Sequence, residues 1–331
     1  MKALVVLNPA AGKQAHGPVC EALRLHFAAS HIRYEVHETR AGEKSSELIR
    51  ARLQESFDLA VAVGGDGTVS DVIDGLAGDS TPLGIVPTGT GNLIARELGI
   101  PTGIDEAVGL IAGEPCLKRI DAMRIGSRVF VLNASVGISA SVIGSTTRKS
   151  KNRFGRIAYL GTTVLKLLSL KPRYLVVAVD GRAEEYRALE VAVLNCGMLA
   201  KMIYPKGPEI HIDDGRLDVW ILGTKTTRTR PRNFVGMIAG RSSDLLPRFI
   251  RAESRVTIRS TIPMPVQADG DIIGTTPVEV ELLPGAVTVL VPKEPVVPRA
   301  LDVDREVIMA QYHPGLARSG KRASKSGVTT K

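Results

Sequence analysis

One short glycine-rich run constrains the fold of this chain more than any other feature. Residues 61–71 read VAVGGDGTVSD, so an apolar stretch from Leu59 onward leads into three glycines that surround Asp66. This order predicts a buried strand, then a turn that no side chain obstructs, and then a helix. Thr68 and Asp71 have the spacing of a capping box, so we expect the helix to begin where the glycines stop.

The same run also predicts an anion-binding site. A turn that opens a helix directs free backbone N–H groups and the positive end of the helix dipole at one point. Asp66 would repel a bare phosphate there, which indicates a magnesium ion between the carboxylate and the phosphates. The run therefore predicts a nucleoside triphosphate with Mg²⁺, and an ordinary tight turn is the structural alternative.

Further motifs of small or acidic residues are spread along the chain. Residues 8–13 read NPAAGK, residues 87–92 read PTGTGN, residues 213–218 read DDGRLD and residues 269–271 read DGD. A second glycine turn is hard to explain by structure alone, because each glycine costs about 0.5–1 kcal/mol relative to alanine. Carboxylates in the strand-rich segment around 269–271 must face a cleft or be satisfied by hydrogen bonds.

In this order, the motifs resemble those of the diacylglycerol kinase catalytic-domain family, in particular the soluble bacterial lipid kinases, over roughly residues 1–295. The resemblance implies an enzyme that transfers the γ-phosphate of ATP to a lipid hydroxyl, with diacylglycerol as the default acceptor and phosphatidic acid as the product. It implies ATP and Mg²⁺ as cofactors, and Asp66 and Asp271 as catalytic residues. Asp271 would be the general base and stands where the family has a glutamate, which puts its efficiency in question.

The resemblance also implies two sets of ligand-binding residues. The nucleotide-binding set follows the first two strands and the two glycine turns: Asn8, Pro9, Ala10, Ala11, Gly12, Thr39, Gly64, Gly65, Asp66, Gly67, Thr68, Val69, Ser70, Asp71 and Thr90. Lys13 would add a charge beside it, and Thr90 is also expected to cap the next helix. A structural Mg²⁺ is expected at the Asp214 carboxylate and the backbone oxygens of His211 and Arg216, with a plain Asp-Gly turn as the alternative.

Strands and helices alternate over residues 1–120. We expect strands at 3–7, 33–39, 57–63 and 83–86, and helices at 18–29, 43–55, 69–77 and 92–98. This alternation predicts an α/β fold, with an N-terminal doubly wound parallel sheet as the ATP-binding domain. Asn8, Thr39, Gly64 and Pro87 all follow strand ends, where ligands bind in such folds, so they are expected to line one crevice.

From about residue 121 the pattern changes to short strands separated by turns. We expect strands at 129–132, 174–179, 189–194, 217–222, 255–258 and 278–283, a hairpin turn at 284–286 that leads to a strand at 287–291, and helical insertions at 157–170 and 231–250. This pattern predicts a mainly antiparallel β-sandwich over 121–295, which would bind the lipid substrate. Residues 296–331 form a basic tail, expected to be disordered from about residue 314.

Composition excludes several other classes of protein. Only 4% of the residues are aromatic, which argues against a single-stranded nucleic-acid binder. The longest apolar stretch is too short to span a membrane, and the apolar start of the chain is too short for a signal peptide. The three cysteines are widely spaced and are expected to be buried thiols in a reducing compartment. These observations predict a cytoplasmic protein.

The net charge of +9 indicates an anionic partner. Basic residues gather in two segments, Arg148, Lys149, Lys151, Arg153 and Arg156 in the first, and Lys225, Arg228, Arg230 and Arg232 in the second. With a lipid substrate, they favour peripheral attachment at the anionic inner face of the membrane, and a solvated surface is the alternative. The apolar contacts would come from Phe154, Ile157, Tyr159, Leu160, Val164, Leu165 and Leu168, which core packing would equally explain.

Other functions stay open at this level. An NAD-kinase-like or phosphofructokinase-like enzyme shares the Gly-Gly-Asp-Gly turn, and a nucleotide-gated regulator without enzymatic activity is a third option. The acceptor could also be a sphingoid base, monoacylglycerol or phosphatidylglycerol, because the chemistry requires only a free hydroxyl. The oligomeric state is open as well, a homodimer being one option.

Overall fold

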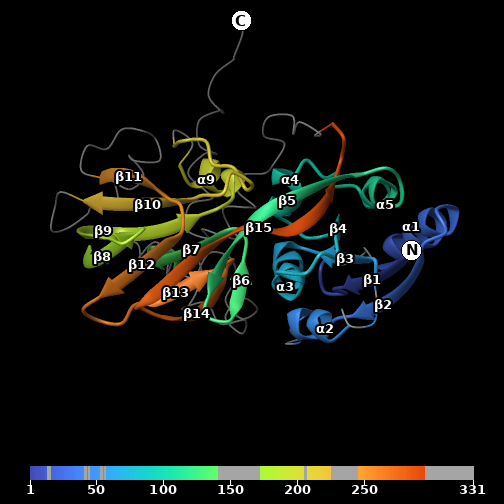
Figure 1. Cartoon of the computed structure of the whole chain (residues 1–331), viewed down its shortest axis with the longest axis horizontal. Coiled ribbons are helices and arrows are strands. Elements are labelled where there is room, and N and C mark those ends of the chain that lie inside the picture. Colours follow the sequence, from blue (N-terminus) through green and yellow to red (C-terminus); the bar gives the residue numbers. More distant parts are fainter. Residues whose placement is uncertain are drawn as a thin grey trace, which may run out of the picture.

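The computed structural model describes residues 1–12, 16–40, 43, 45–52, 55, 57–140, 172–204, 207–224 and 245–294. Lys13, both basic segments, the predicted helix at 157–170 and the tail from residue 296 lie outside these residues. Figure 1 shows the described part as an α/β half that contains the N-terminus and a second half made mostly of strands.

The α/β half is a doubly wound parallel sheet, as predicted. Its strands are β1 (Lys2–Leu7), β2 (Arg33–Glu38), β3 (Leu59–Gly64) and β4 (Leu83–Pro87), in the spatial order β4-β3-β1-β2. The helices α1 (His16–Ala29) and α5 (Ile104–Ala112) cover one face, and α2 (Ser45–Arg52) and α3 (Asp66–Leu76) cover the other. Every residue of β3 is buried, as expected for a strand covered on both faces.

The second half is a mainly antiparallel β-sandwich, which was also predicted. Its strands are β5 (Cys116–Ile125), β6 (Arg128–Phe130), β7 (Asn133–Gly137), β8 (Arg173–Val179), β9 (Arg182–Leu194), β10 (Leu217–Thr224), β11 (Leu245–Ala252), β12 (Arg255–Ser260), β13 (Pro265–Ala268), β14 (Asp271–Thr275) and β15 (Val278–Val291). Two short helices, α4 (Leu93–Glu97) and α9 (Gly197–Ile203), pack against each other where the two halves meet.

The long strand β15 joins the two halves. It pairs antiparallel with β5 and β12, and near its end Val289 pairs parallel with Leu83 of β4. One continuous hydrophobic core therefore includes residues from both halves, among them Ile85 and Trp220. The arrangement keeps the carboxyl edge of the parallel sheet in a fixed relation to the β-sandwich.

Two predicted elements of the second half are wrong. The hairpin at 284–286 does not form, because β15 runs on as one strand with a bulge against β5 between Leu283 and Val287. Gly285 has a φ of +53° and donates its N–H to Asp121 Oδ1 at 2.7 Å, which accommodates the bulge. The described end of the predicted helix at 231–250 is instead strand β11, because residues 245–252 pair along the whole of β10.

The prediction of three buried thiols is correct only for Cys196. Cys20 is partly buried and Cys116, the first residue of β5, is exposed. In the described part of the chain, no helix is both long and apolar enough to cross a membrane.

Candidate functional site

The carboxyl ends of the four parallel strands lie along one edge, as predicted. Asn8 donates its N–H to the Val63 carbonyl at 2.9 Å, and Thr39 donates to the Leu7 carbonyl at 2.8 Å. Thr88 donates to the Gly64 carbonyl at 2.9 Å. These bonds tie each post-strand segment to its neighbour, so the residues after β1, β2, β3 and β4 form one continuous rim.

The two glycine turns touch each other at this rim. A Cβ atom added to Gly89 would lie 2.5 Å from the Gly65 Cα, and one added to Gly65 would lie 3.2 Å from the Gly89 Cα. A larger residue at position 89 would force the turns apart. The two turns therefore make a floor of bare backbone, which is the surface that close approach of a phosphate requires.

Helix α3 begins at Asp66, earlier than predicted. Its N-cap is Gly65, and no side chain caps it, so the predicted capping box of Thr68 and Asp71 is wrong. Thr68 instead accepts a hydrogen bond at its Oγ1 from Asn8 Nδ2 at 3.0 Å. A Cβ on Gly64 would lie 2.4 Å from that oxygen, so the glycine makes room for this contact between the first and third strand ends.

Asp66 lies at the N-terminus of α3 and not in an exposed turn. Its side chain is 4% exposed, and its Oδ1 accepts the Ile94 N–H of α4 at 3.1 Å. The glycines around Asp66 predict that it lies in the turn, whereas the structure places it as the buried first residue of α3. The helix dipole favours a carboxylate in this position, and the bond to α4 fixes it against the second glycine turn.

The second glycine turn has two polar atoms that lack partners. Thr88 Oγ1 and Asn92 Oδ1 are buried and make no hydrogen bond with the described residues. Such atoms cost about 1–3 kcal/mol each when nothing binds them, so a ligand that forms hydrogen bonds with them would offset that cost. Thr90 is exposed, and α4 has Asn92 as its N-cap without a side-chain bond, so the capping role predicted for Thr90 is wrong. The nucleotide-binding role of this turn stays a prediction, and the buried, unpartnered polar atoms in the turn are those of Thr88 and Asn92.

Asp269 and Asp271 have very different surroundings. Asp269 and Gly270 form a two-residue turn between β13 and β14, and the Asp269 carboxylate accepts four hydrogen bonds, from Ser70 Oγ at 2.5 Å and from the N–H groups of Val131, Leu132 and Asn133 at 2.9, 2.9 and 3.0 Å. Burial of this carboxylate raises its pKa, and the four hydrogen bonds oppose the rise. Asp271 is exposed at the start of β14. The Asp269 carboxylate is thus fully used as an acceptor, whereas the Asp271 residue is exposed to solvent.

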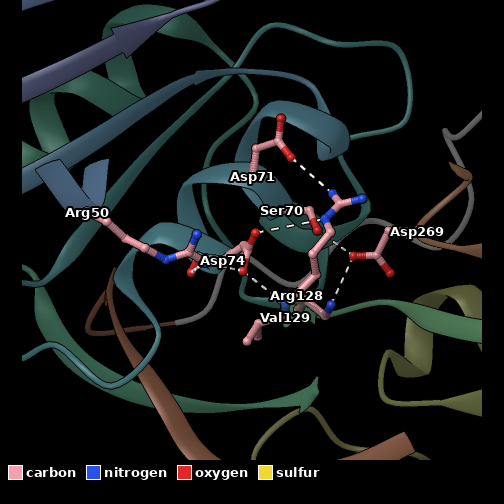
Figure 2. Close-up of polar contacts among 8 residues, drawn as sticks. Arg50, Ser70, Asp71, Asp74, Arg128, Val129 and Asp269 are labelled. Carbon is pink, nitrogen blue, oxygen red and sulfur yellow. Dashed lines mark hydrogen bonds and ion pairs between the residues drawn. The ribbon is translucent and has the colours of Figure 1, made fainter. Parts of the chain in front are cut away.

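Ser70 of α3 thus links the two halves through Asp269, and Asp74 of the same helix provides a second link. Figure 2 shows Asp74 between two arginines, and its Oδ1 accepts from Arg50 at 2.6 Å and from the Val129 N–H at 3.0 Å. Arg128 Nε lies 3.9 Å from Asp74 Oδ2, and Arg128 Nη2 lies 3.4 Å from Asp71 Oδ1. Asp74 is buried, so it fixes β6 of the sandwich against the helix that begins at the glycine floor.

Glu97 provides a third link, which the sequence did not indicate. Its carboxylate accepts the Met198 N–H at 2.6 Å and the Gly197 N–H at 3.2 Å, at the start of α9. A Cβ on Gly197 would lie 2.2 Å from the Ile210 carbonyl oxygen, so glycine is required there. These partners lie about a hundred residues apart in sequence, and no local pattern relates them.

The segment predicted to hold a structural Mg²⁺ forms a fixed loop. Asp214 Oδ1 accepts the Arg216 N–H at 3.1 Å, and the Gly215 N–H donates to Asp121 Oδ2 at 2.7 Å. Asp218 is buried behind the loop, its Oδ1 accepts no hydrogen bond from the described residues, and Arg251 Nε lies 4.0 Å away.

Burial raises the Asp218 pKa, and the negative charge of Asp214 raises it further. The nearby Arg251 guanidinium lowers this pKa and so opposes both effects, and a structural Mg²⁺ at the loop stays a prediction. Within the described ranges, no group of three or more His, Cys, Asp or Glu side chains is arranged to hold a metal, and the predicted ligands are one carboxylate and two carbonyls.

Glu190 of β9 is a buried carboxyl that lies opposite Gly137, the last residue of β7. Burial raises its pKa from 4.5 to about 7, against hydrogen bonds from Ser139 and Ser135. A Cβ on Gly137, the residue opposite on β7, would lie 2.6 Å from Glu190 Oε2, so this glycine makes space for the carboxyl.

We expect the Glu190→Gln variant to lose part of the pH dependence of stability. The folded protein binds the Glu190 proton more tightly than the unfolded chain, so this contribution is complete below pH 4.5 and is lost as the pH rises through about 7. The free energy of unfolding of the variant should exceed that of the unmodified protein by up to about 3 kcal/mol at alkaline pH, and by nothing below pH 4.5. Urea unfolding across this pH range measures this difference in the free energy of unfolding, and Glu185→Gln, at an exposed glutamate, is the control. An unchanged pH slope in Glu190→Gln would contradict the expectation.

Comparison with known proteins agrees with this geometry. Residues 2–125 match the diacylglycerol kinase catalytic domain, and residues 133–291 match the YegS C-terminal NAD kinase beta sandwich-like domain. The Bacillus subtilis diacylglycerol kinase is 28% identical over 88% of this chain and 97% of its own length. The diacylglycerol kinase of Staphylococcus saprophyticus is 30% identical over 66% of this chain and 70% of its own length.

A solved structure extends the likeness to the fold. A proposed diacylglycerol kinase from Bacillus anthracis superposes with a TM-score of 0.72 at 25% identity, covering 88% of this chain and 95% of that one. These likenesses identify the class of the protein as a phosphotransferase. The chain belongs to the bacterial diacylglycerol kinase-like family of lipid kinases.

Proposed function

We propose that this protein transfers the γ-phosphate of ATP to the free hydroxyl of diacylglycerol and so produces phosphatidic acid. The observation that carries the proposal is the contact between Gly65 and Gly89, which makes a backbone floor beside Asp66 at the start of α3. This is a site for phosphates with a bound metal ion, and it faces a second half whose exposed Asp271 suits an acceptor hydroxyl. Residues 1–120 then serve as the ATP-binding domain, and residues 121–295 serve as the lipid domain.

Different residues of the rim would bind the nucleotide and the metal ion. The predicted set from Asn8 to Gly12, Thr39 and the 64–71 turn would hold the nucleotide, and the unpartnered Thr88 and Asn92 atoms join Thr90 in this proposal. When bound, Mg²⁺ would neutralise charge on the phosphates, and Asp66 is the residue that would hold it. A second, structural Mg²⁺ would be held by Asp214 and the carbonyls of His211 and Arg216. The nearby carboxylates of Asp214 and Asp218 favour a cation there.

Asp271 would act as the general base. It would accept the proton of the lipid hydroxyl as that oxygen bonds to the γ-phosphorus, while the bond from this phosphorus to the bridging oxygen breaks and ADP leaves. Its exposure supports this role, because an acceptor can reach it. The role does not suit Asp269, whose carboxylate is already bound by four donors.

Phosphate transfer from ATP labelled at the γ-position tests the proposal. Purified protein would be incubated with detergent micelles that contain diacylglycerol, monoacylglycerol, a sphingoid base or phosphatidylglycerol, and separately with NAD, and the products separated by thin-layer chromatography. Labelled phosphatidic acid is the expected main product. A stronger label in another lipid would show that this lipid, and not diacylglycerol, is the preferred acceptor. Label only in NAD would overturn the lipid proposal.

We also expect the protein to bind anionic membrane surfaces without crossing them. Its proposed substrate is insoluble, and the five cations at 148–156 would be drawn to negatively charged lipids over a screening length of about 8–10 Å. Co-sedimentation with vesicles should rise with the content of anionic lipid and fall with added salt. Changing Arg148, Lys149, Lys151, Arg153 and Arg156 to glutamine should weaken it. Binding that ignores lipid charge and salt would mean that these cations form only a solvated surface.

A further inference from the structure

Two Asp-Gly turns of this chain are built alike, and comparing them points to a role for Ser70. Asp180 and Gly181 join β8 to β9, and Asp269 and Gly270 join β13 to β14. All four residues have positive φ values, 48° and 85° in the first turn and 46° and 91° in the second. This is the backbone of a tight two-residue hairpin, for which Asp-Gly is a preferred sequence.

The two aspartates also have the same kinds of hydrogen-bond donor. Asp180 accepts the N–H groups of three consecutive residues, Glu253, Ser254 and Arg255, and the Ser254 hydroxyl at 2.8 Å. Asp269 likewise accepts three consecutive N–H groups, those of residues 131–133, and one serine hydroxyl, that of Ser70. Three backbone donors and one hydroxyl thus complete both turns.

The turns differ in where the hydroxyl comes from. Ser254 lies within the segment that also supplies the N–H groups to Asp180, so the first turn is completed inside the sandwich. Ser70 belongs to α3 in the other half of the molecule, 199 residues away from Asp269 in sequence. The first turn shows that a local serine is sufficient, so the turn itself does not require a donor from α3. The two aspartates also differ in burial. Burial raises the pKa of the Asp269 carboxyl, whereas at exposed Asp180 the smaller effect of burial is outweighed by the hydrogen bonds, which lower the pKa.

The position of Ser70 along α3 relates it to the phosphate site. Asp66, Ser70 and Asp74 are spaced four residues apart, so they lie on one face of the helix. Asp66 lies at the glycine floor, Ser70 holds Asp269 one turn later, and Asp74 holds the Val129 N–H one turn after that. Figure 2 shows Ser70 and Asp74 on this face, directed at Asp269 and at Arg128 and Val129. One rigid helix therefore connects the floor to the turn that precedes Asp271.

We propose that Ser70 is a positioning residue that fixes the Asp269–Gly270 turn, and through it Asp271, at a set distance from the phosphate site. This inference rests on the proposed function. It changes the role of Ser70 from a predicted nucleotide ligand to a link with the acceptor side, because its buried hydroxyl donates to Asp269. A displacement of about 1 Å between reacting groups can cost up to about 10²-fold in rate, so loss of this link should slow the transfer step.

Ser70→Ala tests the proposal, with Ser254→Ala as the matched control. Each substitution removes one hydroxyl that donates to the aspartate of an Asp-Gly turn. We expect Ser70→Ala to lower kcat by about 10-fold to 10²-fold with little change in the KM for ATP, and Ser254→Ala to leave both unchanged. Equal kcat values in the two variants would overturn the proposal.

A double-mutant cycle separates positioning from loss of stability. If Ser70 acts through Asp271, then adding Ser70→Ala to Asp271→Asn should cause little further loss of kcat. Losses that multiply would overturn the proposal, because they would show that Ser70 acts independently of the base.

Hydrogen exchange distinguishes failure of this inference from failure of the proposed function. If the unmodified protein phosphorylates no lipid, the proposed function fails, and amide exchange with a non-hydrolysable ATP analogue then decides the role of Ser70. Protection of residues 268–273 by the analogue in the unmodified protein and in Ser254→Ala, but not in Ser70→Ala, would support the link. The same exchange in all three proteins, with or without protection, would overturn it.

Discussion

Asp66→Asn should lose at least about 10³-fold in kcat and keep its fold. Asparagine retains the size of the side chain and an oxygen for the Ile94 N–H bond, so the contact between α3 and α4 persists. What is lost is the negative charge at the glycine floor, which is proposed to hold Mg²⁺ against the phosphates. Removal of one preorganised electrostatic group of this kind costs about 10²–10³-fold, and loss of a metal with it should cost more.

The measurement is steady-state phosphate transfer, accompanied by a thermal unfolding curve to check the fold. Asp105→Asn is the matched control, because Asp105 is an exposed aspartate of the same half that pairs with His26 at the surface. It should behave like the unmodified enzyme. A folded Asp66→Asn protein that keeps most of its activity would contradict the assignment of this turn to the nucleotide.

Asp271→Asn should lower kcat by about 10²–10⁴-fold, the usual contribution of a general base. Asparagine matches the shape of aspartate but cannot take up the hydroxyl proton, and ATP affinity should change little because the group lies on the acceptor side. Asp271→Glu offers a sharper comparison, since it keeps the carboxylate and restores the residue that the family resemblance implies. We expect its kcat to stay far above that of Asp271→Asn.

Exposed Asp79→Asn serves as the control for these variants. Asp79 accepts the Thr81 N–H at 2.8 Å, a bond that asparagine can also make. If Asp271→Asn is nearly as fast as the Asp79→Asn control, the base is a different group. Asp269 would be a poor replacement, because all four hydrogen bonds of its carboxylate stabilise the charged form and one of them would have to be released before it could take up a proton.

The parallel sheet and the nucleotide rim could be predicted because their signals are local. Apolar runs such as 59–63 specify strands buried on both faces, and the residues that follow them reach the same edge whatever the rest of the chain does. The two glycine turns are visible in the sequence for the same reason. Their direct contact through Gly65 and Gly89 is not, since it depends on the spacing of β3 and β4.

The errors occur where distant partners override a local pattern. Thr68 has the spacing of a helix cap, yet its hydroxyl accepts a hydrogen bond from Asn8, the residue that follows β1, and the helix begins earlier at Asp66. Pro284 and Gly285 look like a turn, yet pairing with β5 and the Asp121 carboxylate hold them within one bulged strand. The roles of Ser70, Asp74 and Glu97 depend on contacts between the two halves, for which a single sequence has no signal.

The most direct test of the central claim follows the oxygen atoms of the transferred phosphate. The enzyme would be incubated with diacylglycerol in micelles and with ATP that carries oxygen-18 at the three non-bridging γ-positions. The mass of the lipid product would then be measured by mass spectrometry. Transfer of an intact phosphoryl group to the lipid hydroxyl predicts phosphatidic acid that carries three heavy oxygens, formed by the unmodified enzyme and not by Asp66→Asn. Heavy inorganic phosphate alone, with no labelled lipid of any class, would contradict the account.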